Sequence, residues 1–463
     1  MSQTARLISP VDGTTLIERP YVDSRQIGRL LEAAHAAQRD WRAVSIADRA
    51  ALCLRAVDAM LAMQDEIVPE LAWQMGRPVR YGAGELRGFA DRARHMVAIA
   101  EDALADVVPT PIAGFRRYVR REPLGLVFVI APWNYPYLTA VNAVIPALMA
   151  GNAVLLKHAT QTLLVGDRFQ QAMDRAGLPA GLFQNIVVDH AQAAAIIRSG
   201  RVHQVNFTGS VAGGRTIAQL AAERFLGAGL ELGGKDPAYV RADADLEHAV
   251  ANLVDGSFFN SGQSCCGIER IYVDQTIHAR FVERFEALTY DYVLGSPLLA
   301  DTTLGPMVSP KAAQFVRNEV KRAVVQGARS LIDPTRFGAD RPGSAYLAPQ
   351  VVVDVDHSMS LMREENFGPV VGIMAVPGDD EAVALMNDSE YGLTASIWTQ
   401  DLDRAIDLGN RIDTGTVFMN RCDYLDPALA WTGVKDTGRG ATLSRIGYEH
   451  LTRPKSFHLK HAL

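Results

Sequence analysis

Two adjacent cysteines, Cys265 and Cys266, stand in the segment FFNSGQSCCGIER, residues 258–270. A loop rich in glycine, serine and glutamine leads into them, and a strand-like run follows. A small substrate can reach a thiol on such a loop, and its thiolate would be the nucleophile, although a buried and inert cysteine is the alternative. The chain has no CxxC or HxxxH pair, and HLKH at 458–461 is weak and terminal, so we predict no metal site.

A glycine-rich turn and an acidic residue lie upstream of the cysteines. Strand-like QVNFT (204–208) runs into GSVAGG (209–214), and a helix-like segment, 215–224, follows. Such a turn offers backbone N–H groups and a positive helix end to a pyrophosphate, although a plain tight turn is the alternative. In LELGGK (230–235), Glu231 stands among apolar residues and glycines. That setting tends to raise a carboxyl pKa and suits a general base, with a salt-bridged or half-exposed Glu as the alternative.

The elements that must position these residues alternate between strands and helices. The pattern predicts strands at 125–130, 153–157, 184–188 and 204–208, and helices near 138–149, 162–176 and 191–199. This spacing is typical of a doubly wound parallel α/β sheet, in which ligands bind at the carboxyl ends of the strands. We therefore expect the site in the loops after 130, 157 and 208. A second lobe is predicted by strands at 270–274, 370–375, 393–398 and 415–419 and helices at 276–288, 310–326, 380–387 and 401–411.

Composition and charge exclude several classes of protein. The 463 residues carry 46 Lys+Arg and 52 Asp+Glu, a net charge of −6, with 48% hydrophobic residues. This composition is that of a globular protein, and without a basic run it gives no reason to expect a nucleic acid partner. The four cysteines make no disulfide framework, and Asp12, Glu18 and Arg19 interrupt any signal-peptide pattern. We therefore expect a cytoplasmic protein whose mature chain starts here.

An uncharged stretch from Pro123 to Leu156 is long enough to cross a bilayer. Three prolines and three asparagines interrupt it, and lipid would leave the freed backbone groups unsatisfied. We therefore predict that this stretch is interior and that the protein has no membrane partner. By contrast, VVPTPIAGFRRYVRREP (107–123) is rich in charge, proline and β-forming residues. It predicts an exposed ribbon that pairs with another chain, with a mobile, solvated hairpin as the alternative.

Seven motifs in order along the chain together resemble the aldehyde dehydrogenase superfamily. They are APWNYP (131–136), GNAVLLKH (151–158), FTGSVAGG (207–214), LELGGK (230–235), NSGQSC (260–265), EENFGP (364–369) and GVKDTG (433–438). The resemblance implies three parts: a Rossmann-like dinucleotide-binding domain (1–106 and 124–232), an α/β catalytic domain (233–430), and an oligomerisation ribbon (107–123 and 445–463). It also implies a homodimer or homotetramer.

The resemblance implies a role for each matching residue. Cys265, two positions after Gln263, would be the nucleophile, with Cys266 a packing neighbour. Glu231 would be the general base, and the Asn134 amide would complete an oxyanion hole with the Cys265 backbone N–H. NAD or NADP would be held at a further set of matching positions: Trp133, Lys157, Gly209, Ser210, Gly214, Leu232, Glu365 and Phe367. The implied reaction oxidises a small aldehyde to a carboxylic acid through a thiohemiacetal and a thioester on Cys265. The Glu favours water over coenzyme A as acyl acceptor.

Three departures from the family pattern bear on specificity. Thr160 stands where many NAD-preferring members carry a Glu that would repel a 2′-phosphate, so NADP is permitted and NAD is not excluded; a neutral helix N-cap is the alternative role. Asn142 and Phe259 stand where succinate-semialdehyde-oxidising members often carry arginines. Aromatic residues expected at the entrance, Tyr137, Phe259, Tyr424 and Trp431, predict an apolar or aromatic aldehyde, with a packing role as the alternative. Trp431 and Thr432 also replace the usual Phe and Gly.

Rival functions remain at this stage. Succinate semialdehyde or another semialdehyde is the alternative substrate. Cys265 and Glu231 alone would also suit a cysteine esterase without redox chemistry. A catalytically silent relative would lack Cys265, Glu231 or Asn134, and the chain has all three.

Overall fold

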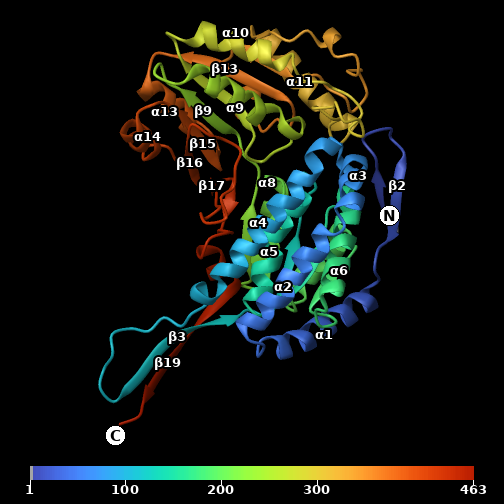
Figure 1. The fold of residues 1–463 in the computed structure, drawn as a ribbon, viewed down its shortest axis with the longest axis vertical. Helices are drawn as coiled ribbons and strands as arrows, with labels where there is room; N and C mark the ends of the chain where they lie inside the picture. Colours follow the sequence, from blue (N-terminus) through green and yellow to red (C-terminus); the bar gives the residue numbers. More distant parts are fainter. Residues whose placement is uncertain (1–3, 463) are drawn as a thin grey trace.

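The computed structural model describes residues 4–462 as two α/β lobes and a protruding two-stranded ribbon. Figure 1 shows the lobe built from the first half of the chain below the lobe built from the second half, with the ribbon pointing away from both. Residues 1–3 and 463 of the predicted domains lie outside the described residues.

The first lobe is built on a six-stranded sheet with the order β18-β8-β7-β4-β5-β6. Its strands are β4 (Leu126–Ile130), β5 (Ala153–Lys157), β6 (Phe183–Asn185), β7 (Gln204–Thr208), β8 (Gly227–Glu231) and β18 (Gly438–Arg439). All are parallel except β18. The chain reverses its direction of travel across the sheet between β4 and β7, and such a switch point creates a crevice at the carboxyl ends of the strands.

Helices surround this sheet and bury its apolar strands. They are α1 (Ser24–Trp41), α2 (Ile46–Leu61), α3 (Gln64–Met75), α4 (Val79–Ala103), α5 (Pro136–Met149), α6 (Leu163–Ala176), α7 (His190–Arg198) and α8 (Val211–Ala222). Strands β4 and β5 are buried along their whole length, and α5 is apolar around nearly its whole circumference. The uncharged stretch is therefore interior, as predicted. Within the described part of the chain, no helix has the length and hydropathy needed to span a membrane.

The second lobe contains a seven-stranded sheet with the order β11-β12-β13-β10-β9-β15-β16. Its strands are β9 (Asp236–Val240), β10 (Ile268–Asp274), β11 (Arg329–Ser330), β12 (Gln350–Val353), β13 (Val370–Val376), β15 (Thr394–Trp398) and β16 (Thr416–Met419). Only β11 is antiparallel to its neighbour. The helices are α9 (Leu246–Phe258), α10 (His278–Thr289), α11 (Pro310–Val325), α12 (Ser360–Arg363), α13 (Asp379–Asn387) and α14 (Leu402–Gly409).

Three small sheets complete the fold. Strands β1 (Thr4–Ile8) and β2 (Thr15–Pro20) form a hairpin, and β14 (Tyr391–Gly392) pairs with β17 (Val434–Lys435). The ribbon pairs β3 (Phe115–Pro123) with β19 (Thr452–Lys460), antiparallel over nine residues each. Tyr118 and Phe457 stack across it with ring centroids 4.5 Å apart. Strand β3 thus begins at Phe115, whereas the predicted ribbon segment begins at residue 107.

The predicted elements match the structure closely, with one strand shorter than expected. Residues 184–188 were predicted as a strand, but β6 ends at Asn185. The chain then leaves the sheet to reach Asp189, which caps α7 by accepting a hydrogen bond from the backbone N–H of Gln192. Strand β18 joins the first sheet although it lies beyond residue 430 in the chain. The domain boundaries given above stay a prediction.

A buried arginine joins the ends of three helices in the first lobe. Arg49 of α2 donates to the carbonyl of Met149 at the end of α5 (2.9 Å) and to those of Trp41 (3.3 Å) and Arg42 (3.0 Å) at the end of α1. Carbonyls in the last turn of a helix have no partner within the helix, so the guanidinium satisfies groups that burial would otherwise leave unpaired.

We predict that Arg49→Met destabilises the protein by about 2 to 3 kcal/mol, because methionine fills similar space but leaves the carbonyls of Met149 and Arg42 without a donor. Urea unfolding followed by circular dichroism measures the change. Arg39→Met is the matched control, since Arg39 is exposed in the last turn of α1, and it should stay within about 0.5 kcal/mol of the parent. Equal stability of the two variants would contradict the assigned role of Arg49.

Candidate active site

A strained loop between α9 and β10 presents Cys265. Asn260, Ser261 and Gly262 all adopt left-handed backbone conformations, with φ of 54°, 57° and 67°. Glycine is required at 262, because a Cβ atom there would collide with the carbonyl of Gly368. Such conformations strain the backbone of non-glycine residues, and the strain persists only where surrounding contacts impose it. The loop leaves Cys265 partly exposed and Cys266 buried.

Hydrogen bonds hold this loop against the first lobe. The side-chain amide of Asn260 donates to the carbonyls of Asn134 and Gln263, each at 3.1 Å. Gln263 in turn accepts from the backbone N–H of Val308 at 2.7 Å. The loop of the second lobe is thereby fastened to the segment after β4, at the edge where the first sheet presents its carboxyl ends.

Asn134 lies directly behind the cysteine loop. Its Nδ2 donates to the carbonyl of Gln263 at 3.2 Å, two residues before Cys265, and its side chain is buried. An amide nitrogen carries two hydrogens, so one remains for a further acceptor. Asn134 is not among the side chains that line the open cavity described below.

A buried ion pair that the sequence analysis missed supports Asn134. Arg77 donates to the Asn134 carbonyl at 2.6 Å and forms an ion pair with Glu85. Glu85 accepts the backbone N–H groups of Tyr137 (2.9 Å) and Leu138 (3.3 Å) at the start of α5. One carboxylate thus caps the helix while its partner fixes the preceding turn. Arg77 and Glu85 lie in no motif, and only their depth of burial marks them.

Glu231 is the last residue of β8 and lies beside Thr208, the last residue of β7. Thr442 donates to one carboxylate oxygen at 2.5 Å and Thr208 to the other at 3.4 Å. Burial raises the pKa of Glu231, while the hydrogen bond from Thr442 and the charge of Arg92 work against that rise. The Glu231 carboxyl therefore keeps its proton to a higher pH than a free Glu does.

Asp423 is a second carboxylate near the cysteines. It accepts hydrogen bonds from the hydroxyl of Ser264 (3.0 Å) and the thiol of Cys266 (2.9 Å), the residues on either side of Cys265. Its own φ is 46°, in the left-handed region. Asp423 therefore holds the backbone around Cys265, and the thiol of Cys266 points into this contact.

A cavity of about 480 Å³ joins Cys265 and Glu231. Three of the four aromatic residues predicted at the entrance line it, namely Phe259, Tyr424 and Trp431, and Tyr81 packs edge-on against Phe259 at 5.0 Å. Tyr137 was predicted there wrongly: its side chain is buried in the core and stacks on Phe169 at 5.8 Å. The α5 helix turns that ring toward Phe89 of α4 and Phe169 of α6, away from the cavity.

The cavity is also more charged than the sequence analysis expected. Arginines and carboxylates share its wall: Arg77, Arg80, Arg87, Arg92, Asp91, Asp255 and Asp423. Arg80 and Arg87 are exposed and have no hydrogen-bonding partner among the described residues. Burial and the nearby charge of Asp423 raise the pKa of Asp255 to about 6. Residues 80, 84, 87, 88 and 91 are spaced so that they lie on one face of α4, and this spacing can be read from the sequence. None of the seven family motifs includes these residues.

The predicted phosphate-binding residues form the start of α8. Ser210 is its N-cap and accepts the backbone N–H of Gly213 at 3.2 Å. A Cβ atom at Gly209 would lie 2.7 Å from the ring of Phe207, and one at Gly214 would collide with Leu232. A larger residue at either position would have to displace a neighbouring side chain. Glycines at these positions leave the backbone N–H groups at the helix start open to a pyrophosphate.

Lys157 and Thr160 follow strand β5. Lys157 is 7% exposed, and its ammonium has no hydrogen-bonding partner among residues 4–462. Burial lowers its pKa. An ammonium without a protein partner on an otherwise buried side chain fits a site that a ligand completes. Thr160 is exposed in a short 3₁₀ helix (Thr160–Thr162) and is not its N-cap, which is Ala159, so the capping role considered above is excluded.

Glu365 and Phe367 face the same cleft from the second lobe. Glu365 accepts the backbone N–H of Gly234 at 3.1 Å, and burial raises its pKa to about 8. Phe367 has φ of 48° and meets Trp133 edge-on at 5.6 Å. Its backbone is held by Glu269, which also binds the buried ammonium of Lys235 at 2.5 Å.

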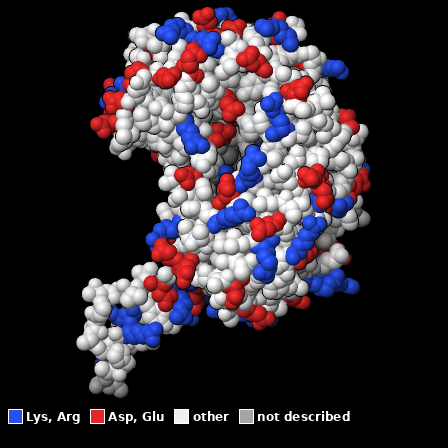
Figure 2. Space-filling view, viewed as in Figure 1, with Lys and Arg blue, Asp and Glu red and all other residues white. Residues whose placement is uncertain are grey.

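A hollow of about 500 Å³ runs from Ser210 and Ala212 to Glu365 and Tyr391. Figure 2 shows the surface hollowed between the two lobes, with side chains of both charge signs, Lys and Arg as well as Asp and Glu, around the hollow. The glycine-lined helix start, the unpaired Lys157 and the Phe367–Trp133 pair fit a dinucleotide. Across the described chain there is no group of three or more His, Cys, Asp or Glu residues that could hold a metal.

Comparison with known proteins agrees with this geometry. Residues 1–457 match the aldehyde dehydrogenase family model. An aldehyde dehydrogenase of Paenarthrobacter nicotinovorans is 34% identical, with 97% of this chain and 98% of that protein covered. The NADP-dependent succinate-semialdehyde dehydrogenase of Deinococcus radiodurans is 33% identical, with coverages of 97% and 93%.

Solved structures give the same result. The NADP-dependent glyceraldehyde-3-phosphate dehydrogenase of Bacillus halodurans, complexed with NADP, is 31% identical with a TM-score of 0.92, covering 99% of this chain and 96% of that one. PnpE in complex with nicotinamide adenine dinucleotide is 29% identical with a TM-score of 0.94 and coverages of 99% and 95%. The resemblance seen in the seven motifs is thereby confirmed, and the chain belongs to the aldehyde dehydrogenase family of NAD(P)-dependent oxidoreductases.

Proposed function

We propose that this protein oxidises an aldehyde to a carboxylic acid with NAD or NADP and water. The observation that carries the proposal is that Cys265 and Glu231 face one cavity from different lobes. Asn134 is fastened to the same loop as the cysteine. The dinucleotide cleft would supply the oxidant beside them.

In the first step the Cys265 thiolate adds to the aldehyde carbonyl, forming a C–S bond and a thiohemiacetal oxyanion. The free hydrogen of the Asn134 amide and the backbone N–H of Cys265 would donate to that oxyanion. One such donor contributes about 2.7 to 4 kcal/mol to transition-state stabilisation. The contacts from Arg77 and Asn260 keep Asn134 in place, so no reorganisation is needed as charge develops.

A bound NAD or NADP would supply the acceptor for the hydride of the thiohemiacetal carbon. The start of α8 would hold the phosphates, Lys157 and Glu365 the ribose ends, and Phe367 the side of the ring. With Thr160 in place of a carboxylate, no negative charge at that position opposes a 2′-phosphate, so we propose that both dinucleotides are used.

In the last step Glu231 takes a proton from a water molecule that attacks the thioester, and the C–S bond breaks to release the acid. The buried carboxyl has a raised pKa and can accept this proton and later return it. Cys265 and Glu231 would also suffice for an esterase. Formation of reduced nicotinamide, seen by its absorbance after aldehyde is added, separates the two functions.

For the substrate, we propose an aldehyde with an apolar or aromatic body. The aromatic wall formed by Tyr81, Phe259 and Trp431 supports this proposal. A second candidate is a semialdehyde with a distal carboxylate, because Arg80 and Arg87 offer unpaired guanidinium groups on the same wall. These arginines would bind the carboxylate in place of the arginines that this chain lacks at Asn142 and Phe259.

We also propose that the β3–β19 ribbon binds a second copy of this chain in a dimer or tetramer. A two-stranded ribbon is marginal by itself, and both of its strands are edges. Cytoplasmic location stays a prediction.

Replacing Cys265 by Ala should lower aldehyde oxidation by at least about 1000-fold, because the covalent route needs the thiolate. Dinucleotide binding, followed by calorimetry, should stay unchanged. Cys266→Ser is the matched control, since serine still donates to Asp423, and we expect it to keep most of the activity. Unchanged turnover in Cys265→Ala would refute the nucleophile assignment.

Replacing Glu231 by Gln should slow deacylation by about 100- to 10,000-fold, the usual contribution of a general base. The first turnover should still yield one equivalent of reduced nicotinamide, so a burst and a trapped thioester are expected by stopped-flow absorbance and mass spectrometry. In the parent protein, deacylation should rise as the pH increases through the raised pKa of Glu231, since only the carboxylate accepts a proton. The variant should lose this rise. Steady turnover without a trapped acyl-enzyme would count against Glu231.

Replacing Arg87 by Met should lower kcat/KM for succinate semialdehyde by about 5- to 30-fold, the effect of one charge-assisted hydrogen bond. The value for benzaldehyde should stay within about 2-fold, because that aldehyde has no anion. Arg94→Met is the control, since Arg94 lies on the same helix but pairs with Asp58 outside the cavity. Equal losses for both aldehydes would mean that Arg87 only supports the wall.

A further inference from the structure

Arg92 of α4 carries a cation on an otherwise buried side chain, and it lines the substrate cavity. The side chain is 9% exposed, and no carboxylate among residues 4–462 forms an ion pair with it. Arginine does not lose its proton in a protein, and buried charges are normally paired. The guanidinium therefore fits a site that an anion from outside the chain completes.

The edge of the guanidinium that remains free is the one that matches a carboxylate. Nη1 of Arg92 donates to the carbonyl of Leu138 at 2.7 Å and to Oδ1 of Asn142 at 3.4 Å. Nε and Nη2 have no hydrogen-bonding partner in the part of the chain that the structure describes. Their N–H groups lie side by side in the guanidinium plane and can bind both oxygens of one carboxylate. Arg92 thus offers a bidentate donor pair that no protein group uses.

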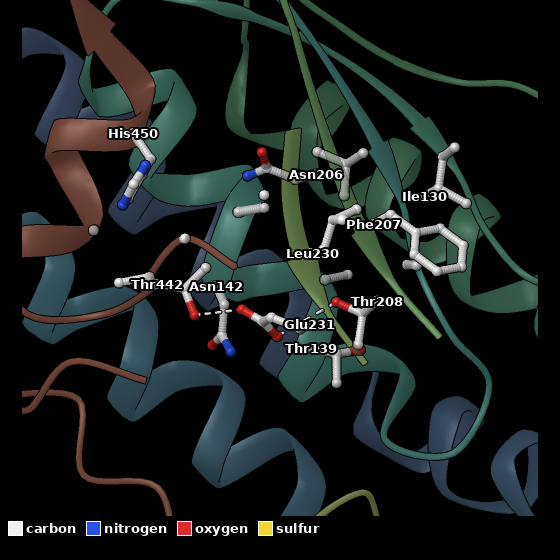
Figure 3. Close-up of a pocket in the computed structure, with 18 of the residues that line it drawn as sticks. Ile130, Thr139, Asn142, Asn206, Phe207, Thr208, Leu230, Glu231, Thr442 and His450 are labelled. Atoms are coloured by element: carbon white, nitrogen blue, oxygen red, sulfur yellow. Dashed lines mark hydrogen bonds between the residues drawn. The ribbon is translucent and has the colours of Figure 1, made fainter. Parts of the chain in front are cut away.

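Asn142 of α5 adds a third donor to the same cavity. Because arginine can only donate, the Asn142 oxygen faces Arg92, and the amide nitrogen is left for another acceptor. Nδ2 has no hydrogen-bonding partner among the described residues, although the side chain is only 3% exposed. Asn142 and Glu231 both line the substrate cavity, and Figure 3 shows both side chains. A buried donor without an acceptor is unfavourable, so this amide also fits a ligand that brings an oxygen.

Arg92 and Asn142 lie at the reacting end of the cavity. Burial lowers the pKa of Arg92, and the charges of Cys266, Glu231 and Cys265 oppose that change. The guanidinium is therefore within electrostatic reach of the groups that react. Arg87, by contrast, is exposed and lies five residues earlier on α4, about 7 to 8 Å along the helix axis. An anion at Arg92 would lie close to the aldehyde carbon, whereas Arg87 suits an anion farther from it.

We propose that Arg92 and Asn142 form an inner subsite that binds a carboxylate of the substrate beside the reacting carbonyl group. The inference rests on the proposed function, because it assigns a substrate class to the same cavity: short aldehydes that carry a carboxylate. It gives the second substrate candidate named above an anchor deeper than the exposed arginines. The two side chains hold the substrate and take no part in bond making, so their replacement changes selectivity between aldehydes.

The first test compares succinate semialdehyde with butanal, a neutral aldehyde of the same chain length. Asn142→Asp keeps the shape of the side chain and places a fixed carboxylate beside Arg92, which would occupy the guanidinium and repel an anionic substrate. We expect the ratio of kcat/KM for succinate semialdehyde to kcat/KM for butanal to fall by about 100-fold, the effect of two charge-assisted hydrogen bonds. A ratio is measured because it is insensitive to a general loss of activity.

Arg92→Lys is the second variant, since lysine keeps the charge but lacks the paired N–H groups. The same ratio should fall by about 10-fold. Arg94→Lys is the matched control, because Arg94 lies on the same helix and pairs with Asp58 outside the cavity. Its ratio should equal that of the parent. Glyoxylate, compared with acetaldehyde, should lose as much selectivity in both subsite variants and none in Arg87→Met, because its carboxylate is next to the aldehyde carbon.

Binding of succinate, followed by calorimetry, gives a measurement that needs no turnover. We expect succinate to bind the parent and Arg94→Lys alike and to bind Asn142→Asp at least about 10-fold more weakly. Equal selectivity ratios in the parent and the subsite variants would overturn the inference, as would a parent that binds no succinate. Failure of the proposed function is distinguishable, because the parent would then bind succinate but form no reduced nicotinamide from any aldehyde.

Discussion

The carbonyl group of Asn134 is the point on which the site depends. Arg77 from the turn before α4 and Asn260 from the loop after α9 both donate to it. The hydrogen bond from Asn260 ties the cysteine loop of the second lobe to the segment after strand β4 in the first, and the one from Arg77 holds that segment within the first lobe. The cysteine, the amide and the sheet edge therefore keep one geometry, although they come from distant parts of the chain. Preorganisation of this kind is what stabilises charge that develops only in a transition state.

Buried charges make this junction rigid. The Arg77–Glu85 pair and the Lys235–Glu269 pair are almost fully buried, and each carboxylate also accepts backbone N–H groups next to the site. Removing one partner of such a pair leaves a charge without compensation, which is strongly destabilising. The pairs thus fix the turns at residues 134–137 and 366–367, and those turns carry the side chains that would face substrate and dinucleotide.

Environment separates the roles of the two carboxylates near the cysteine. Asp423 accepts hydrogen bonds from both neighbours of Cys265, so its carboxylate holds that loop in place. Glu231 receives its hydrogen bonds from two threonines at a sheet edge, and burial raises its pKa. The same functional group therefore serves as a structural tie in one place and suits proton transfer in the other.

The sequence by itself determined the alternation of strands and helices and the family, and it singled out Cys265, Glu231 and the glycine-rich turn as candidates. These follow from local patterns: apolar runs of strand length, glycines that only a close backbone approach explains, and motifs in a fixed order. Only the tertiary structure decided what depends on the direction of a side chain. Tyr137 turned out to face the core, one face of α4 brought unpaired arginines to the cavity, and Arg77 with Glu85 came to support Asn134. Helix rotation and the meeting of two lobes set these contacts between residues far apart in the chain, and no local pattern records them.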